Sequence, residues 1–212
     1  MRKACAIITL IALFSLGLAG NCIAGMDLGI SIGDDGLKSF YLAIGDYYRV
    51  PEKEIVKVKK KKIPHDEIPV VFFIAKRAGV SVGTVIDLRI KGTAWMDISL
   101  RFGLGPDIFY VPVKKVGGPP YGNAYGHYKN KPRKHWKTIR LSDPDVVNLV
   151  NLKFISEHYG YPPEEVISMR SKGNSFVVIS NEVKKKKGAQ KAKSDKERDV
   201  SSVTKHKGKG KK

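Results

Sequence analysis

Cysteine is almost absent from this chain of 212 residues, and both copies, Cys5 and Cys22, lie at the N-terminus. They fall within residues 1–24, which have the pattern of a secretory signal peptide. Cleavage after Ala24 would leave a mature chain without a thiol. That excludes disulfides, thiolate metal sites and a cysteine nucleophile, so stability must come from a packed core.

The apolar run of this leader is too short for a typical membrane helix. Ala4 to Leu18 spans about 15 residues, whereas a transmembrane helix needs roughly 20. Arg2 and Lys3 supply the charged start, and small residues precede the cleavage position. We predict export to the periplasm or beyond, with no transmembrane anchor after processing. An uncleaved anchor and a lipoprotein acylated at Cys22 remain alternatives.

Signatures of catalysis are also missing. The sequence has no serine in a nucleophile elbow and no glycine-rich phosphate loop ending in Lys-Ser or Lys-Thr. The carboxylate pairs at 66–67 and 164–165 begin predicted helices, where the helix dipole explains them. His127 and His135 are eight residues apart with no acidic residue between them, which suits no simple metal site. We predict a protein that is not an enzyme and has no cofactor or bound metal. An enzyme or metal-binding protein that uses residues 112–144 remains an alternative.

One pattern is present twice, at residues 73–98 and again, 81 positions later, at 154–179. A fainter copy lies 30 positions upstream of the first. Internal repetition of this kind is typical of helical repeat proteins. The glycine corners predict helices over 68–78 and 82–90, and the fold class is all-α, with repeated helix-turn-helix units packed in one domain. The matched structural positions are Gly79 and Gly160, Arg89 and Arg170, Gly92 and Gly173, and Trp95 and Phe176.

The two arginines of these pairs have the same predicted role. Each lies in the last turn of a predicted helix and precedes an aromatic residue by six positions. A guanidinium there can neutralise the last carbonyl groups of the helix, while its apolar stem packs on the ring. We therefore interpret them as structural.

Composition divides the rest of the chain. We predict a signal peptide (1–24), a glycine-rich arm (25–37), helical repeats (38–111), a basic aromatic insertion rich in glycine and proline (112–144), a last repeat (145–183) and a lysine-rich tail (184–212). The tail has 13 lysines and arginines against 3 acidic residues, a net charge of +10, and almost no apolar side chains. Such a composition predicts disorder.

The insertion is the candidate for contact with a partner. Flat rings beside cations can stack on bases or sugars while the cations meet phosphate or sulfate. The alternative is a soluble loop that docks through its tyrosines. The candidate residues are Tyr121, Tyr125, Tyr128, Lys129, Lys131, Arg133, Lys134, Trp136, Lys137 and Arg140.

Residues 74–85, with their Ala-Gly-Val-Ser corner, resemble the helix-turn-helix of lac-repressor-type transcription regulators. The resemblance implies that a recognition helix begins at Ser81, Val82, Gly83 and Thr84 and faces the major groove of DNA. The leader would carry the protein away from the chromosome, and the corresponding helix of the second copy begins with two glutamates. We therefore interpret the corner as helix packing and keep a helix-turn-helix DNA-binding protein as the alternative.

The whole unit resembles repeats of secreted bacterial proteins of uncharacterised activity. The resemblance rests on a shared order of residues: Gly, Val-Ile, Arg, Gly, then Trp or Phe, and Ile. That resemblance implies an exported, all-helical protein and carries no activity. Together with the +19 formal charge, it predicts a non-enzymatic binding or scaffolding protein. Its expected partners are anionic: an envelope polymer, extracellular nucleic acid or an acidic protein.

Overall fold

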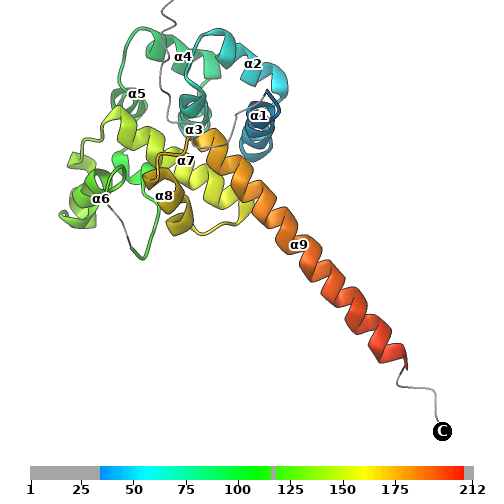
Figure 1. Ribbon diagram of the computed structural model, residues 1–212. Helices are drawn as coiled ribbons and strands as arrows, with labels where there is room; N and C mark the ends of the chain where they lie inside the picture. Colours follow the sequence, from blue (N-terminus) through cyan, green and yellow to red (C-terminus); the bar gives the residue numbers. More distant parts are fainter. Residues whose placement is uncertain (1–33, 116–117, 208–212) are drawn as a thin grey trace, which may run out of the picture. The chain divides into compact units, whose positions relative to one another are not determined.

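The computed structural model describes residues 34–115 and 118–207, and Figure 1 shows their helices in chain order. Every regular element in these ranges is helical, which confirms the all-α class. The predicted signal peptide lies outside them, as does the arm up to residue 33. The α-helices are α1 (Asp34–Tyr48), α2 (Glu52–Lys60), α3 (Ile68–Ala78), α4 (Val82–Ile90), α5 (Trp95–Arg101), α6 (Gly122–Lys129), α7 (Asp143–Tyr159), α8 (Pro163–Ser171) and α9 (Phe176–Lys207); short 3-10 helices are η1 (His65–Glu67), η2 (Pro106–Phe109) and η3 (Arg133–Thr138).

Helix α3 is the centre of the core. Its residues from Ile68 to Ala75 are all buried, so it has apolar side chains around its whole circumference over that stretch. It packs against α1, α2, α4, α5 and α7. One hydrophobic cluster runs from Phe40 to Val183, so the N-terminal and C-terminal helices share a single core.

Two glycines turn the chain at equivalent corners. Gly79 follows α3 with φ 67°, and Gly160 follows α7 with φ 56°, both in the left-handed region that favours glycine. In each corner the next amide closes the turn, with N–O distances of 3.1 Å from Val80 to Ala75 and 2.9 Å from Tyr161 to Ser156. Both helices therefore end in the same way.

The next corners are also equivalent. Gly92 (φ 85°) follows α4 and Gly173 (φ 91°) follows α8, and each amide donates over 2.9 Å to the carbonyl of Arg89 or Arg170. Thirty positions before Gly79 and Gly92, Arg49 and Lys62 have positive φ angles of 59° and 58°. The same backbone turns thus occur after α1 and α2, although side chains other than glycine occupy them.

The predicted insertion is folded where it is described. It contains α6 and η3, and the side chains of Tyr121, Tyr125 and Tyr128 are buried, with exposed fractions of 0%, 6% and 3%. Each hydroxyl donates to a backbone carbonyl, of Asn148, Val111 and Pro106 respectively. The expectation that these three rings stack on a partner is wrong, because they belong to the core.

The lysine-rich tail also differs from the prediction of disorder, because α9 continues to Lys207. The first turns of α9 are anchored in the core by Phe176, Ile179 and Val183. A packed start removes the nucleation cost of a helix, and lysine, alanine, glutamine and glutamate then extend it readily. Lys184 to Lys186 are exposed, and residues 208–212 lie outside the described ranges. None of the helices described here combines the length and apolar character needed to cross a bilayer.

Candidate functional site

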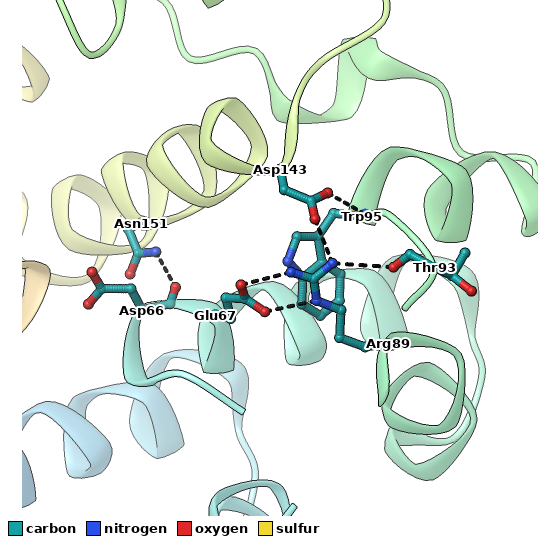
Figure 2. A network of polar contacts seen from close by, with 7 residues as sticks. All are labelled: Asp66, Glu67, Arg89, Thr93, Trp95, Asp143 and Asn151. Atoms are coloured by element: carbon teal, nitrogen blue, oxygen red, sulfur yellow. Dashed lines mark hydrogen bonds and ion pairs between the residues drawn. The ribbon is translucent and has the colours of Figure 1, made fainter. Parts of the chain in front are cut away.

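The guanidinium of Arg89 joins three segments of the chain, as Figure 2 shows. Its Nε and Nη2 donate to the two carboxylate oxygens of Glu67 in η1, over 2.9 and 2.8 Å. Its Nη1 donates over 2.5 Å to Asp143, the first residue of α7. One arginine at the end of α4 is thereby paired with two carboxylates from other helices.

Trp95 completes this cluster. Arg89 lies over its ring, with the guanidinium carbon 4.6 Å from the ring centroid. The amide of Trp95 donates over 2.7 Å to the second oxygen of Asp143, so that carboxylate also satisfies the start of α5. Burial opposes the charge of Arg89, but the hydrogen bonds with Glu67 and Asp143 outweigh it and its pKa is raised. The arrangement joins η1, the end of α4 and the starts of α5 and α7.

Arg170 occupies the corresponding position in α8, without a carboxylate. Its guanidinium lies over Phe176 at 4.5 Å and donates over 3.0 Å to the carbonyl of Asn174. Its Nε donates over 3.2 Å to the side-chain oxygen of Asn148. Asn148 stands 81 positions after Glu67, so an amide replaces the carboxylate of the first cluster. Among the described residues no acidic side chain forms an ion pair with Arg170.

Asp66 and Asn151 lie beside the Arg89 cluster (Figure 2). The side-chain amide of Asn151 donates to the backbone carbonyl of Asp66 over 2.7 Å and to that of Val147 over 2.9 Å. Burial raises the pKa of the Asp66 carboxyl, and attraction to Arg170 partly offsets that effect. Asp66 therefore balances some of the charge of Arg170 from beyond hydrogen-bond distance.

Six of the eight cations of the insertion form what we call the basic surface: Lys129, Lys131, Arg133, Lys134, Lys137 and Arg140. All are exposed except Lys131, which is half-buried and donates to Thr138. Arg133 lies over the ring of Trp136 at 5.2 Å. The indole nitrogen of Trp136 donates to the carbonyls of Tyr128 and Lys131, which fixes the ring against α6. Within the described ranges, none of the six forms an ion pair.

The charge of this region is one-sided in the sequence as well. Val111 to Ser142 contains eight lysines and arginines and no aspartate or glutamate. The excess of cations is visible in the sequence alone. The structure adds that buried tyrosines hold the backbone that carries them. His127 and His135 belong to the same region, and in the described part of the chain no three His, Cys, Asp or Glu side chains are grouped as metal ligands.

The residues proposed for DNA contact lie at the exposed start of α4. Ser81, Gly83 and Thr84 are exposed, and Val82 is half-buried. The Ser81 hydroxyl accepts from the Thr84 amide over 3.1 Å and caps the helix. Ser81, Val82 and Gly83 border a groove of about 440 Å³. Its other wall carries Glu54, Lys57 and Lys60 of α2 and Lys61, the residue after that helix.

No protein-family model matches the chain, and no curated protein or solved structure is significantly similar to it. The resemblances to lac-repressor-type regulators and to secreted repeat proteins therefore remain predictions. The function has to be argued from the chain's own residues.

Proposed function

We propose that this protein is a non-enzymatic, exported binding or scaffolding protein that contacts anionic polymers through the basic surface. The observation that carries the proposal is the region from Val111 to Ser142, which has eight cationic and no acidic side chains. Export rests on the signal-peptide pattern of residues 1–24. Envelope polymers, extracellular nucleic acid and acidic proteins all carry the charge that this surface attracts.

The cations of the basic surface are held on an ordered backbone. Three buried tyrosines and the bonded indole of Trp136 hold the backbone beneath the cations. Cations on an ordered support lose less conformational entropy on binding than cations on a free loop. The exposed lysines at the start of the tail, Lys184 to Lys186, add to the overall attraction.

The scaffold, in this proposal, is a repeated helix-turn-helix unit. The supporting observations are the matched glycine corners and the arginine–aromatic pairs, which recur 81 residues apart. Arg49 and Lys62 continue the pattern upstream. The repeated positions serve packing, whereas the basic surface belongs to the segment between the copies.

A DNA-binding role for α4 is the second candidate. It is favoured by the exposure of Ser81, Gly83 and Thr84 and by the three lysines across the adjoining groove. Glu54 and Asp87 line the same groove and would repel phosphates. Lys57 of this groove is already paired with Glu54, whereas none of the six cations of the basic surface forms an ion pair within the described ranges. We therefore place the basic surface first.

The proposal is tested by measuring the affinity of the full chain for a single-stranded oligonucleotide and for polyphosphate over a range of salt concentrations. Binding through counterion release gives a linear fall of log K with log salt, and each lost phosphate contact reduces the slope by about one. The variant Arg133→Gln/Lys134→Gln/Lys137→Gln should weaken both probes and reduce the slope.

A matched control removes three exposed lysines elsewhere: Lys53→Gln/Lys91→Gln/Lys172→Gln. The two triple variants have the same net charge, so a purely global attraction would weaken both equally and would overturn the proposal. Protection of one defined duplex, lost in Thr84→Ala but kept in the insertion variant, would favour the DNA-binding candidate instead.

A further inference from the structure

A groove of about 900 Å³ lies between α1 and α2, away from the basic surface. Leu42 on α1 and Val56 on α2 line it, with exposed fractions of 49% and 39%. Among the described residues only one other large hydrophobic side chain is as exposed, Ile90 at 51%. Two of the three therefore meet in one groove, and its base includes the buried side chain of Ile55.

The groove has two distinguishable ends. At Gly45, α1 and α2 approach closely, because an added Cβ would lie 3.2 Å from the carbonyl oxygen of Val50 and 3.3 Å from Ile55 Cδ1. This is the end next to the turn that joins the helices. Further from the turn, Lys59 of α2 reaches over the ring of Tyr41 of α1, at 5.7 Å.

The charges that line the groove are divided between these ends. Near the turn, Arg49 is accompanied by the acidic residues Asp46 and Glu52. At the far end the lining cations are Lys38, one helical turn before Tyr41, and Lys59 over the Tyr41 ring, and neither of the two lining acids is there. The groove thus combines an apolar middle with a cationic outer end.

We propose that this groove binds a long-chain fatty acid, with the acyl chain along Leu42, Val56 and Ile55 and the carboxylate between Lys38 and Lys59. The volume falls within the range of small-molecule sites, which are mainly apolar with a few placed polar groups. Two lysines at one end give the carboxylate an attractive field, and the apolar middle removes methylene groups from water.

A partner protein is a poorer match for the same groove. A stable protein interface buries on the order of 1,200 Å² or more in total, usually around several large apolar anchors. Only Leu42 and Val56 are available here as exposed anchors. The site is also separate from the basic surface, so the inference goes beyond the proposed function and does not depend on it.

Titration calorimetry of the full chain with dodecanoate, below its micelle concentration and in about 150 mM salt, tests the inference. We expect one site per chain. Leu42→Gln/Val56→Gln should weaken binding about tenfold or more, since this change places two amides in the path of the acyl chain. Ile90→Gln is the matched control, an equally exposed apolar residue outside the groove, and should bind like the parent.

The position of the carboxylate head group is tested by changing the charge of the protein and of the amphiphile. Lys38→Gln/Lys59→Gln should weaken dodecanoate binding, whereas Lys134→Gln/Lys137→Gln on the basic surface should not. Dodecyltrimethylammonium has the same chain length with a cationic head, and it should bind more weakly than dodecanoate to the parent.

Several outcomes would overturn the inference: no binding of dodecanoate, equal loss in Ile90→Gln, or equal binding of the cationic amphiphile. A change of oligomeric state in Leu42→Gln without dodecanoate binding would assign the groove to a second copy of the chain instead. Loss of polyanion binding in the basic-surface variants leaves these measurements unaffected, so the two proposals fail separately.

Discussion

The Nε atom of Arg170 donates to the side-chain oxygen of Asn148 over 3.2 Å, and these two residues stand 81 positions after Arg89 and Glu67. In both pairs the arginine Nε donates to a side-chain oxygen, but the acceptor is a carboxylate in Glu67 and a neutral amide in Asn148. Asp143, which also binds Arg89, has no counterpart beside Arg170 among its hydrogen-bond partners in the described part of the chain. The first cluster is therefore a charge-paired joint, and the second is held by neutral acceptors and by Phe176.

Removal of Arg89 should destabilise the protein strongly. Arg89→Gln leaves Glu67 and Asp143, whose side chains are 16% and 30% exposed, without their cation. Breaking a fully buried pair costs about 3–5 kcal/mol, and solvent screening should reduce the cost here to about 2 kcal/mol. Urea unfolding followed by circular dichroism measures the change. Arg170→Gln should cost less, because Asp66 loses only an attraction from beyond hydrogen-bond distance and no ion pair is broken. The exposed Arg101→Gln should cost almost nothing. A loss in Arg89→Gln no greater than in Arg101→Gln would contradict the role of this cluster.

An added carboxylate at position 148 should make stability more dependent on pH. In Asn148→Asp the new carboxylate would accept from Arg170 directly. We expect this charged hydrogen bond to lower its folded-state pKa by more than the burial of position 148 (5% exposed) raises it, so that the folded value lies below the unfolded one. The stabilisation is then present above the unfolded value and is lost as the pH falls through the folded one. Unfolding free energies at several acidic pH values measure the effect. In the Arg170→Gln background the added dependence should largely disappear, as a double-mutant cycle would show.

The corner glycines should be sensitive to alanine for reasons of backbone conformation alone. A Cβ at Gly79 or Gly160 would meet nothing within 4 Å, yet both residues have positive φ. Gly79→Ala and Gly160→Ala should each cost about 1–2 kcal/mol, the strain of a left-handed alanine. Gly126, within α6 and also with open space around it, is the control. Gly126→Ala should stabilise the protein by about 0.5–1 kcal/mol, and a loss there would contradict the helix.

Stability should fall at mildly acidic pH through His158. Burial lowers the pKa of His158 from its ordinary 6.5, Asp46 raises it in part, and Lys184 lowers it further. The unfolded chain therefore binds the proton first, and stability is lost as the pH falls through about 6.5. Thermal unfolding of His158→Gln should show a smaller fall over this range than the parent. His135→Gln, an exposed histidine, controls for the loss of an imidazole, and an equal effect in both would contradict the assignment.

The helices around the first glycine corner could be predicted from the sequence alone. Gly79, Ser81 and the apolar spacing predict helices over 68–78 and 82–90, and α3 and α4 have these bounds. Local capping and backbone preference decide such boundaries, and both are visible in a short stretch of sequence. The pairing of Arg89 with Glu67 and Asp143 was not predicted, because the partners are 22 and 54 residues away. Only the packing of whole helices brings them together.

The insertion shows where composition misleads. Its glycines and prolines favoured an open loop, but the spacing of Tyr121, Tyr125 and Tyr128 by four and three residues is that of one helical face. That spacing was the available signal for burial. The groove between α1 and α2 had no such signal, since exposed Leu42 and Val56 differ from core residues only by their place in the fold.

Gly45 sets how near α2 can come to α1, because the backbone oxygen of Val50 and the tip of Ile55 already occupy the space where a methyl group would stand. A glycine inside a helix lowers the stability of that helix, and here the missing side chain lets α1 and α2 pack closely. Alanine there would require Val50 or Ile55 to move by a few tenths of an ångström, and a larger side chain would require more. The absence of a side chain at Gly45 therefore helps to set the width of the groove that a ligand would enter.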